Sequence, residues 1–451
     1  MKKTDVLVIG GSAAGLVAAL TGKSQYPEKD FLVIRKEEVV VVPCGIPYIF
    51  GSLENSAQNV IPDAGLEKAG IGLLVGEVVD IDPETKTCTL ADGQEVSFEK
   101  LVLAIGSNPV KPNWLKGKDL DNVFTVPKDK EYLDALVDKL HGKEKIVVIG
   151  GGFIGVEISD ELNKLGKDVT VVEILPHVLG AVFDEELAIK AEEVLIDRGV
   201  KVEAGAGVKE IVGNGKVEKV SLQDGKELPA DAVILSMGYK PNIELAQKAG
   251  IETNELGFIK VDRYLRTRTP DIFAVGDCAE KRDFITNKPI GAMLASTACA
   301  EARVTGMNLF KLETVRTFSG TISNFATALG DHSFGVAGIT EDTARAEGFD
   351  IVTSTFEGVD HHPGKLPGTH AQAVKLVVAK DSGLILGGSV FGGHSTGEIV
   401  NVIGLAIQNN MTVSSLLTMQ IGTHPLLTAP PTAYPLIKAA ELALRKIHCP
   451  A

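Results

Sequence analysis

Two apolar runs, each followed by a group of glycines, mark the hydropathy pattern of this chain. The first run covers residues 5–9 and precedes Gly10-Gly11-Ser12-Ala13-Ala14-Gly15, after which alanine and leucine prevail. The second run covers residues 146–149 and precedes Gly150-Gly151-Gly152-Phe153-Ile154-Gly155. Each pattern predicts a buried strand, a tight glycine turn and a helix.

The repeat extends beyond the two glycine groups. Asp92-Gly93 lies between alternating segments and is followed by an apolar run that ends at Gly106. Asp224-Gly225 stands in the same relation to a run that ends at Gly238. An Asp-Gly pair between alternating segments is a strong signal for a β-hairpin. The chain therefore predicts two nucleotide-binding domains built on one plan.

Pro- and Asn-rich segments at 107–113 and 238–242 separate these domains. From about residue 317, strands and turns lead to an apolar helix at 398–408. We predict an α/β fold with two Rossmann-like domains and a C-terminal α+β domain. The expected ranges are 1–115 and 244–316 for the first domain, 116–243 for the second and 317–451 for the third.

A glycine turn between a strand and a helix places backbone N–H groups and the positive helix end against a pyrophosphate. In the first turn Ser12 replaces the middle glycine, whereas the second turn is complete. The strand after the second turn ends at Glu173. A carboxylate there accepts hydrogen bonds from both ribose hydroxyls and repels a 2′-phosphate, which predicts NADH rather than NADPH. The alternative is a solvated glutamate at a strand end.

The corresponding position after the first turn holds a base. The strand at 31–34 is followed by Arg35, where an acid is usual, and by Glu37 two residues later. Either Glu37 binds the ribose or Arg35 packs over the adenine, and the sequence leaves both interpretations open.

Composition is that of an ordinary globular protein of about three domains. Of the 451 residues, 44% are apolar and 23% are charged, and the formal net charge is −14. No basic cluster interrupts this acidic balance, which disfavours nucleic acid or an anionic membrane as partner. No apolar run approaches the ~20 residues of a membrane span, so we expect a soluble, cytoplasmic protein.

Five cysteines are scattered along the chain, without the spacing of metal ligands. Their odd number indicates a reducing compartment, and no metal site is expected. Cys44, in the segment 39–48, is the candidate for chemistry, either as a reactive thiolate or as a buried apolar side chain. We expect Cys278 and Cys299 to be packing residues, Cys88 to lie in an alternating strand and Cys449 to lie in the tail.

In the order in which they occur, these motifs resemble those of the flavoprotein pyridine nucleotide–disulfide oxidoreductases. The matching pieces are 10–15, 44–48, 103–106, 150–155, 238–242 and 269–277. The chain is most similar to the single-cysteine branch, which includes NADH oxidases, NADH peroxidases and coenzyme A-disulfide and persulfide reductases. The resemblance covers essentially the whole chain.

The resemblance implies that the first domain binds FAD and the second binds NAD(H). It places Asp277 at the ribityl chain of the flavin, Leu294-Ala295-Ser296 against the pyrimidine edge, and Phe153 over the face that the nicotinamide reaches. It adds Gly106 and Gly238 to the cofactor contacts. The C-terminal domain would form a homodimer and complete the partner's active site.

The same resemblance implies that hydride passes from NADH to the flavin and that electrons then reach oxidised Cys44. No second cysteine occurs between Cys44 and Cys88. Cys44 is therefore expected to cycle through a sulfenic acid, a mixed disulfide or a persulfide.

Several positions depart from the patterns of the branch. Ala13 stands where peroxidases and water-forming oxidases have a histidine. Lys23 alone replaces the arginines that bind coenzyme A phosphates. Lys365 or Leu366, together with Thr428, replaces the paired tyrosines of coenzyme A-disulfide reductases, which disfavours coenzyme A as the substrate.

Residues 423–429 resemble the His-Pro segment of the two-cysteine disulfide reductases, in which the histidine is an acid/base acting across the dimer. His424 is the matching histidine, and Ala429 replaces the glutamate that orients it. His424 is thus either a proton donor to the leaving thiolate or a structural histidine before Pro425. His361 and His362 predict a polar loop near the interface, since no third ligand accompanies them for a metal.

Together these features predict an FAD-dependent enzyme that uses NADH to reduce a small disulfide, persulfide or polysulfide through Cys44. One alternative is an NADH oxidase that reduces dioxygen to peroxide or water. Another is an electron-transfer component that docks a protein acceptor, although a one-electron shuttle needs no thiol.

Overall fold

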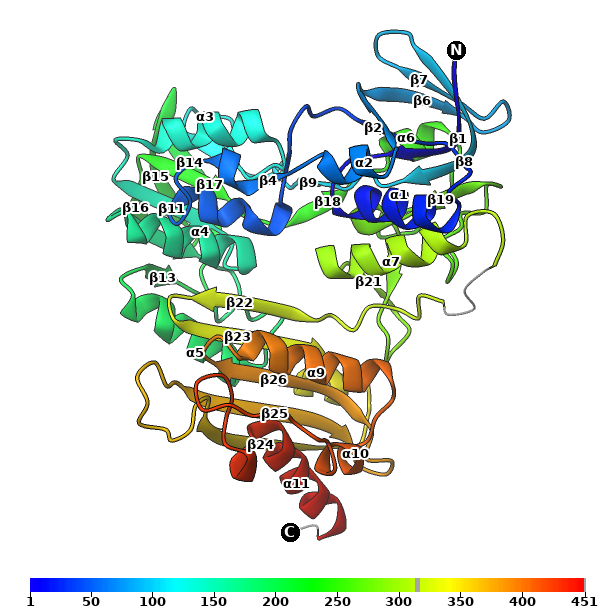
Figure 1. Ribbon diagram of the computed structural model, residues 1–451. Coiled ribbons are helices and arrows are strands. Elements are labelled where there is room, and N and C mark those ends of the chain that lie inside the picture. The colour runs from blue at the N-terminus through cyan, green and yellow to red at the C-terminus, as the bar shows by residue number, and fades with distance from the viewer. Residues whose placement is uncertain (313–316, 450–451) are drawn as a thin grey trace.

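A mixed, largely parallel sheet and a parallel sheet stand side by side, and an antiparallel sheet lies below them in Figure 1. The computed structural model describes residues 1–312 and 317–449. This arrangement confirms the predicted fold class. The domain boundary expected after residue 316 lies outside the described residues.

The first unit is built on the parallel strands that the sequence predicted around the first glycine turn. Its sheet runs in the order β5-β2-β1-β8-β7-β6, with β19 beside β8. Because β19 comes from residues 272–274, the chain returns to this sheet after it has formed the second unit. The strands are β1 (Lys2–Ile9), β2 (Phe31–Arg35), β5 (Gly72–Val75), β6 (Val78–Asp82), β7 (Thr87–Leu90), β8 (Glu95–Leu103) and β19 (Ile272–Ala274).

Other elements from the same parts of the chain lie around this sheet, except that the segment 41–50 packs into the hydrophobic cluster of the second unit. The helices are α1 (Ala13–Gln25), η1 (Pro43–Phe50), η2 (Ser56–Asn59), α2 (Ala64–Lys68), α6 (Glu244–Lys248), η3 (Gly276–Cys278) and α7 (Ala295–Met307). The short strands are β3 (Val40–Val41), β4 (Val60–Ile61), β9 (Ser107–Pro109), β20 (Lys281–Arg282) and β21 (Pro289–Ile290). Among these helices α1 and α7 pack directly together, and a Cβ on Gly306 would lie 2.8 Å from the backbone nitrogen of Gly22.

The second unit repeats the plan with a five-stranded parallel sheet in the order β10-β17-β11-β12-β13. Its elements are β10 (Val123–Thr125), α3 (Lys130–Leu140), β11 (Lys145–Ile149), α4 (Phe153–Lys164), β12 (Asp168–Val172), α5 (Glu185–Asp197), β13 (Lys201–Glu203) and β17 (Ala232–Leu235). A separate antiparallel sheet contains β14 (Val208–Asn214), β15 (Lys216–Leu222) and β16 (Glu227–Pro229).

Both predicted hairpins are present. Asp92-Gly93 joins β7 to β8, and Asp224-Gly225 joins β15 to β16. Gly93 and Gly225 have φ angles of +85° and +92°, which glycine adopts without strain. β18 (Tyr239–Pro241) pairs with β9, so the two crossings between the units run side by side.

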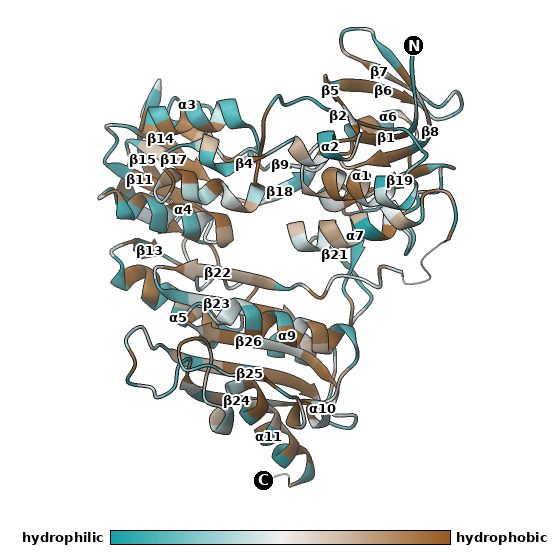
Figure 2. Ribbon diagram, in the orientation of Figure 1, coloured by the Kyte–Doolittle hydropathy of each residue, from teal (hydrophilic) through white to brown (hydrophobic). Residues whose placement is uncertain are grey.

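The third unit is the predicted α+β domain, with the antiparallel order β22-β23-β26-β25-β24. Its elements are β22 (Phe325–Leu329), β23 (His332–Gly338), α8 (Glu341–Ala346), β24 (Ile351–Val359), β25 (Ala371–Ala379), β26 (Ile385–Gly392), α9 (Thr396–Gln408), α10 (Val413–Leu417), η4 (Pro431–Ala433) and α11 (Pro435–His448). Helices α9 and α11 share one hydrophobic cluster with this sheet. Figure 2 shows the strands largely in the hydrophobic colour, whereas the helices carry both colours.

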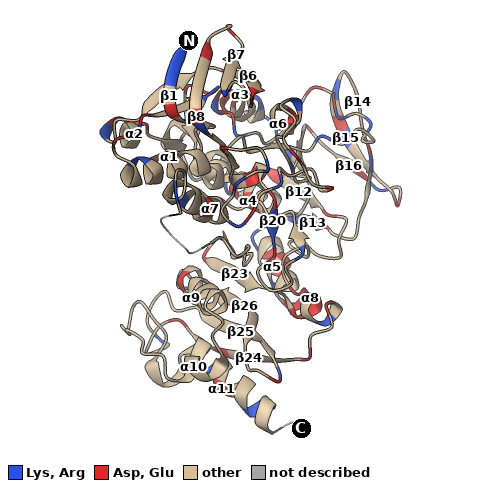
Figure 3. Ribbon diagram, turned by 90° about the vertical axis from the view of Figure 1, so that its right-hand side faces the viewer, with Lys and Arg blue, Asp and Glu red and all other residues tan. Residues whose placement is uncertain are grey.

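Charged residues of both signs are spread along the ribbon in Figure 3. Acidic residues occupy the first turns of α5 and α8, which meet at the junction between the second and third units. None of the described helices is both long and apolar enough to cross a membrane.

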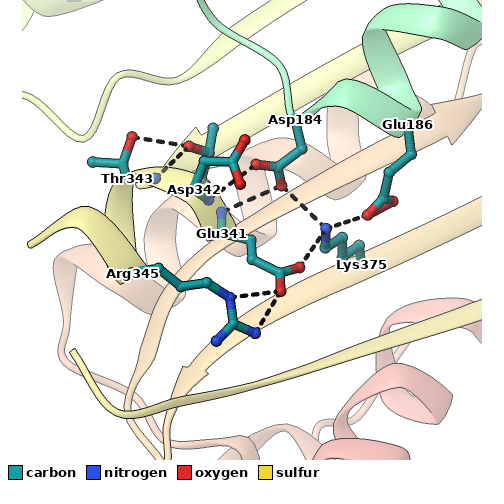
Figure 4. A network of polar contacts seen from close by, with 8 residues as sticks. Asp184, Glu186, Glu341, Asp342, Thr343, Arg345 and Lys375 are labelled. Carbon is teal, nitrogen blue, oxygen red and sulfur yellow. Dashed lines mark hydrogen bonds and ion pairs between the residues drawn. The ribbon is translucent and has the colours of Figure 1, made fainter. Parts of the chain in front are cut away.

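A buried lysine joins the second unit to the third (Figure 4). The ammonium nitrogen of Lys375, on β25, lies 3.2 Å from an Asp184 carboxylate oxygen and 2.8 Å from one of Glu341. Glu186 also pairs with it, at 2.5 Å. Asp184 additionally accepts the backbone N–H groups of Glu341 and Asp342 at the start of α8. Burial works to lower the pKa of Lys375, but the surrounding carboxylates outweigh it and raise that pKa.

We expect Lys375→Met to lower the free energy of unfolding by about 3 kcal/mol near neutral pH, because it leaves buried carboxylates without a counter-charge. Lys375 and Arg345 together hold the pKa of Glu341 below its ordinary value against burial, so its contribution is present at neutral pH and lost in acid. The deficit should therefore shrink as the pH falls below about 4. Denaturant unfolding at several pH values measures it.

Lys380→Met is the matched control, since Lys380 pairs with Asp350 at 3.5 Å on the surface. Its effect should stay within about 0.5 kcal/mol at every pH. Equal effects of the two substitutions would show that the Lys375 contacts do not stabilise the junction.

Candidate active site

The two glycine turns have the same backbone geometry. The φ angles of Gly10 and Gly150 are +112° and +108°, in the region that favours glycine. A Cβ on Gly15 would lie 1.9 Å from the carbonyl oxygen of Gly10, and a Cβ on Gly155 would lie 1.9 Å from that of Gly150. Both helices therefore begin directly against their turns, as the repeat in the sequence predicted.

The helices that follow these turns leave their N-termini free to bind an anion. Ser12 and Gly152 are the N-cap residues of α1 and α4, and neither has a side-chain capping bond. No acidic residue occupies the first turn of either helix. Free N–H groups at a positive helix end suit a phosphate, so both turns fit a dinucleotide pyrophosphate.

A cavity of about 750 Å³ opens beside the first turn. Four of the residues expected to bind cofactor line it, namely Gly10, Ser12, Arg35 and Gly106. Behind it, a Cβ on Gly276 would lie 2.9 Å from that of Ala14 in α1, which shows how closely η3 approaches this helix. The cavity has the size of a cofactor site.

Glu173 follows β12 and lies against the second glycine turn. One carboxylate oxygen accepts the N–H of Gly151 at 2.6 Å, and the other accepts that of Leu175 at 2.8 Å. Each oxygen keeps a further lone pair for another donor. The strand-end acid therefore stands beside the turn, where the fingerprint places a ribose.

Arg35 occupies the equivalent place beside the first turn. A Cβ on Gly11 would lie 2.6 Å from Cδ of Arg35, so the stem of this side chain covers the turn. Its guanidinium turns away and pairs with Asp63 at 2.8 Å, and it also donates to the carbonyl of Glu37. Arg35 and Glu37 both line the cavity, so the two interpretations of this strand end remain predictions.

Asp277 lies in η3, next to the first sheet. Its carboxylate accepts a hydrogen bond from Ser107 at 2.7 Å and pairs with Lys128 at 2.7 Å. Burial would raise the pKa of Asp277, but Lys128 and Ser107 lower it below its ordinary value. Asp277 is thus an anionic acceptor in a pocket where the hydroxyls of a ribityl chain could donate. Lys128, from the loop between β10 and α3, was not anticipated from the sequence.

The expected pyrimidine-edge segment forms the N-terminus of α7. Leu294 is the N-cap, and Ala295 and Ser296 begin the helix. Glu301, on the same helix, accepts the N–H of Gly276 at 2.7 Å and pairs with the fully buried Lys281. This bond links α7 to η3 and so fixes Asp277 relative to the helix end.

Gly106 and Gly238 mark the crossings between the first and second units. Both have positive φ angles, of +69° and +87°. The carbonyl of Gly106 accepts the N–H of Asn242, and the carbonyl of Gly238 accepts that of Val110. The two glycines therefore occupy equivalent places in the repeated plan.

Cys44 lies in the first turn of η1, with its side chain exposed. This overturns the interpretation of Cys44 as a buried apolar side chain. Surrounding protein nevertheless desolvates the thiol, and this desolvation together with the charge of Glu157 raises its pKa, against the effect of Lys128. Cys44 is therefore accessible but is a thiol, and not a preformed thiolate, at neutral pH.

Cys299, which we expected to be a packing residue, lies in α7 and is partly exposed. A charge on it would raise the pKa of Cys44, so the two thiols are neighbours. Cys278 and Cys88 are buried, with no exposed surface, and Cys449 is exposed near the C-terminus.

Glu157 is a charged neighbour of Cys44 that had no role in the sequence-based prediction. It lies one helical turn after Phe153 in α4, and its carboxylate accepts a hydrogen bond from Thr327 of β22 at 2.7 Å. Burial raises its pKa to about 7, although the Thr327 bond opposes this. The only signal in the sequence was its spacing of four residues from Phe153.

Phe153 stacks on Phe325 of β22, with ring centroids 5.3 Å apart, and meets Phe183 edge to face. Ile154 packs against the same hydrophobic cluster. The structure thus places Phe153, which we expected over the flavin face that the nicotinamide reaches, where α4 meets the third unit.

His424 lies far along the chain in an exposed turn. Its Nδ1 accepts the N–H of Leu426 at 3.2 Å, and its own backbone N–H donates to the hydroxyl of Thr428. Among the described residues its hydrogen bonds stay within this turn. No group of three or more His, Cys, Asp or Glu side chains in the described parts is placed to hold a metal.

Comparison with known families identifies both parts of the chain. Residues 4–302 match the model described as pyridine nucleotide-disulphide oxidoreductase, and residues 326–434 match the dimerisation domain of that name.

Individual relatives cover nearly the whole chain. An NADH oxidase of Methanocaldococcus jannaschii is 32% identical over 455 residues, which span 98% of this chain and 99% of the relative. A CoA-dependent NAD(P)H sulfur oxidoreductase of Pyrococcus abyssi is 33% identical over 425 residues, 93% of this chain and 94% of the relative. The structure of an NAD-dependent persulfide reductase from A. fulgidus superimposes with a TM-score of 0.90 at 32% identity, covering 98% of this chain and 83% of that one.

The raised pKa of Glu157 predicts a pH-dependent stability. Between its ordinary pKa near 4.5 and its folded value of about 7, the folded state holds a proton that the unfolded state has lost. Stability contributed by this proton is therefore complete below the lower value and falls as the pH rises through the upper one. We expect Glu157→Gln, which mimics the protonated acid, to gain about 1–2 kcal/mol relative to the wild type between pH 5 and pH 8.

Urea unfolding at fixed protein concentration, with Glu185→Gln as the exposed control on α5, measures this difference. Parallel pH curves for the wild type and Glu157→Gln would contradict the shift.

Proposed function

The chain belongs to the pyridine nucleotide-disulphide oxidoreductase family and is an NAD(P)H-dependent flavoprotein oxidoreductase, and we propose that it reduces a small disulfide, persulfide or polysulfide through Cys44. The observation that carries this proposal is the exposed thiol of Cys44, with Glu157, Lys128 and Asp277 as its charged neighbours. We propose NADH as the preferred donor and a homodimer as the working form.

The first glycine turn and Asp277 would hold FAD, and the second turn with Glu173 would hold the nicotinamide nucleotide. When bound, FAD accepts a hydride from NADH and supplies the two electrons that restore Cys44 after each turnover. The protein's part is to place these groups and to manage the protons at Cys44.

Reduction of a disulfide R–S–S–R begins with attack by the Cys44 sulfur on one sulfur of the acceptor. The S–S bond of the acceptor breaks, a Cys44–S–S–R bond forms, and R–S⁻ leaves and takes a proton. Because its pKa is raised, Cys44 must lose a proton before it attacks. Ionised Glu157 raises the pKa of Cys44 further. The pair therefore carries a single negative charge more readily than a charge on each group.

His424 of the partner subunit is proposed to donate a hydrogen bond to the leaving thiolate, which then takes its proton from solvent. Its Nδ1 accepts a hydrogen bond from Leu426, so the neutral ring carries its proton on Nε2. The turn is exposed on the third unit, which is the dimerisation domain of the family. His424 would thus complete a site whose thiol belongs to the other chain.

Dioxygen is the second candidate acceptor. The 32% identity to an NADH oxidase over almost the whole chain favours it. Ala13 at the first glycine turn supplies no acid or base to a peroxide intermediate, and the sulfur oxidoreductase relative is equally similar. We therefore place sulfur acceptors first. A CoA-dependent relative keeps coenzyme A thiols among the sulfur compounds to be tested.

Anaerobic titration with NADH tests the role of Cys44. The oxidised wild type should take up one equivalent of NADH beyond the flavin's own demand and develop a long-wavelength thiolate-to-flavin band. Cys44→Ser should lack both the extra equivalent and the band, and Cys278→Ser should keep them, because Cys278 is buried. Identical titrations of the wild type and Cys44→Ser would leave dioxygen as the leading acceptor.

Glu173 should set the preference for NADH. We expect Glu173→Ala to reduce the ratio of kcat/KM for NADH to that for NADPH at least about tenfold, because it removes a ribose acceptor and a repulsive charge. Glu203→Ala, at the end of neighbouring β13, should leave the ratio unchanged. A wild-type enzyme that prefers NADPH would refute this assignment.

A further inference from the structure

Two adjacent histidines hold the turn that carries His424. The ring Nε2 of His361 lies 2.8 Å from the carbonyl oxygen of Leu426, and the ring Nδ1 of His362 lies 3.0 Å from that of Thr428. The backbone N–H of His362 donates to the carbonyl of Pro425 at 3.1 Å. In the described parts of the chain, these three bonds are the ones that join residues 423–428 to another segment.

The chemistry of these contacts fixes where the protons lie. A carbonyl oxygen only accepts, so Nε2 of His361 and Nδ1 of His362 must each carry a hydrogen. Inside the turn, the N–H of Leu426 donates to Nδ1 of His424. The peptide groups of Leu426 thus connect the two rings: its carbonyl is held by His361 and its N–H orients His424.

The loop that carries the two histidines is closed at its base by a buried aspartate. Asp360, which follows β24, is 3% exposed and accepts the backbone N–H of His370 at 2.7 Å. Its carboxylate also contacts the ring Nδ1 of His370 at 3.1 Å. Since His370 directly precedes β25, Asp360 joins the two ends of the loop from which His361 and His362 reach the turn.

We propose that His361 and His362 are positioning residues that aim the Nε2–H of His424 at the leaving thiolate in the partner's site. This inference rests on the proposed function, in which His424 donates a hydrogen bond to the leaving thiolate. It assigns a role to the adjacent histidines that metal binding does not explain. A chain of hydrogen bonds runs from His361 through Leu426 to His424.

The test compares two disulfides that differ in their need for a proton. Bis(hydroxyethyl) disulfide releases a basic alkyl thiolate, whereas dithiobis(nitrobenzoate) releases a stable aromatic thiolate that leaves without protonation. We expect His361→Leu and His362→Leu to lower kcat with the alkyl disulfide about tenfold or more, and to leave kcat with the aromatic one unchanged. KM for NADH should not change.

Conservative variants separate positioning from folding. In His361→Gln the amide nitrogen takes the place of Nε2, and in His362→Asn it takes the place of Nδ1, so both keep the donor and should recover most of the alkyl-disulfide rate. His394→Leu, at an exposed histidine of the same unit, is the control and should behave as the wild type. Equal losses with both disulfides, or no recovery in the amide variants, would overturn the proposal.

The double variant His361→Leu/His424→Ala asks whether the first histidine acts through the second. Its alkyl-disulfide rate should equal that of His424→Ala alone, because a positioning residue has no effect once its target is gone. A further loss in the double variant would show that His361 acts elsewhere, and would overturn the proposal.

Mixed dimers test the proposed function separately. A dimer of one Cys44→Ser chain and one His424→Ala chain retains one complete site only if His424 acts across the interface. We expect about half of the wild-type alkyl-disulfide activity from this dimer. An inactive mixed dimer, or a fully active His424→Ala homodimer, would refute the role of His424 itself, whereas an active mixed dimer with unaffected His361→Leu and His362→Leu variants would refute only the positioning role.

Discussion

Helix α4 determines how the thiol, the second nucleotide site and the third unit stand relative to one another. Three of its side chains, each one turn apart, contact other units: Phe153 stacks on Phe325, Glu157 accepts from Thr327, and Glu161 accepts the backbone N–H of Ser52. Residues four apart share one face of a helix, so a single face makes all three contacts. The glycine turn at the start of α4 therefore cannot shift without moving Glu157 relative to Cys44.

The surroundings of Cys44 and Glu157 favour the protonated forms of both groups. Burial raises the pKa values of Glu157 and Cys44, and the charge of Glu157 further disfavours ionisation of Cys44, whereas Asp277 stays anionic because Lys128 and Ser107 stabilise it. Acidic groups in one small space therefore take different protonation states according to their partners. Cys44 therefore meets an incoming electrophile as a neutral thiol, and no permanent thiolate is exposed to oxidants.

What the sequence predicted well was local. The glycine turns, the Asp-Gly hairpins and the place of Glu173 depend on residues within one strand–turn–helix unit. The features it missed join distant segments: Lys128 meets Asp277 across 149 positions, and Glu157 meets Thr327 across 170. Hydrophobic periodicity reports which face of an element is buried but not which other domain covers it, so these pairs carry no local signal.

The turn at 424–428 has a consequence for how enzymes of this design diversify. It belongs to neither a sheet nor a helix, and in the described parts of the chain two adjacent histidines supply its hydrogen bonds to other segments. Substitutions there disturb little of the hydrophobic core, whereas substitutions in the glycine turns meet backbone atoms at about 2 Å. With the turn at the acceptor, as proposed, a lineage can exchange one electron acceptor for another while its nucleotide-binding turns stay constant. Relatives named NADH oxidase and NAD(P)H sulfur oxidoreductase, at 32% and 33% identity, are what such an inheritance would leave behind.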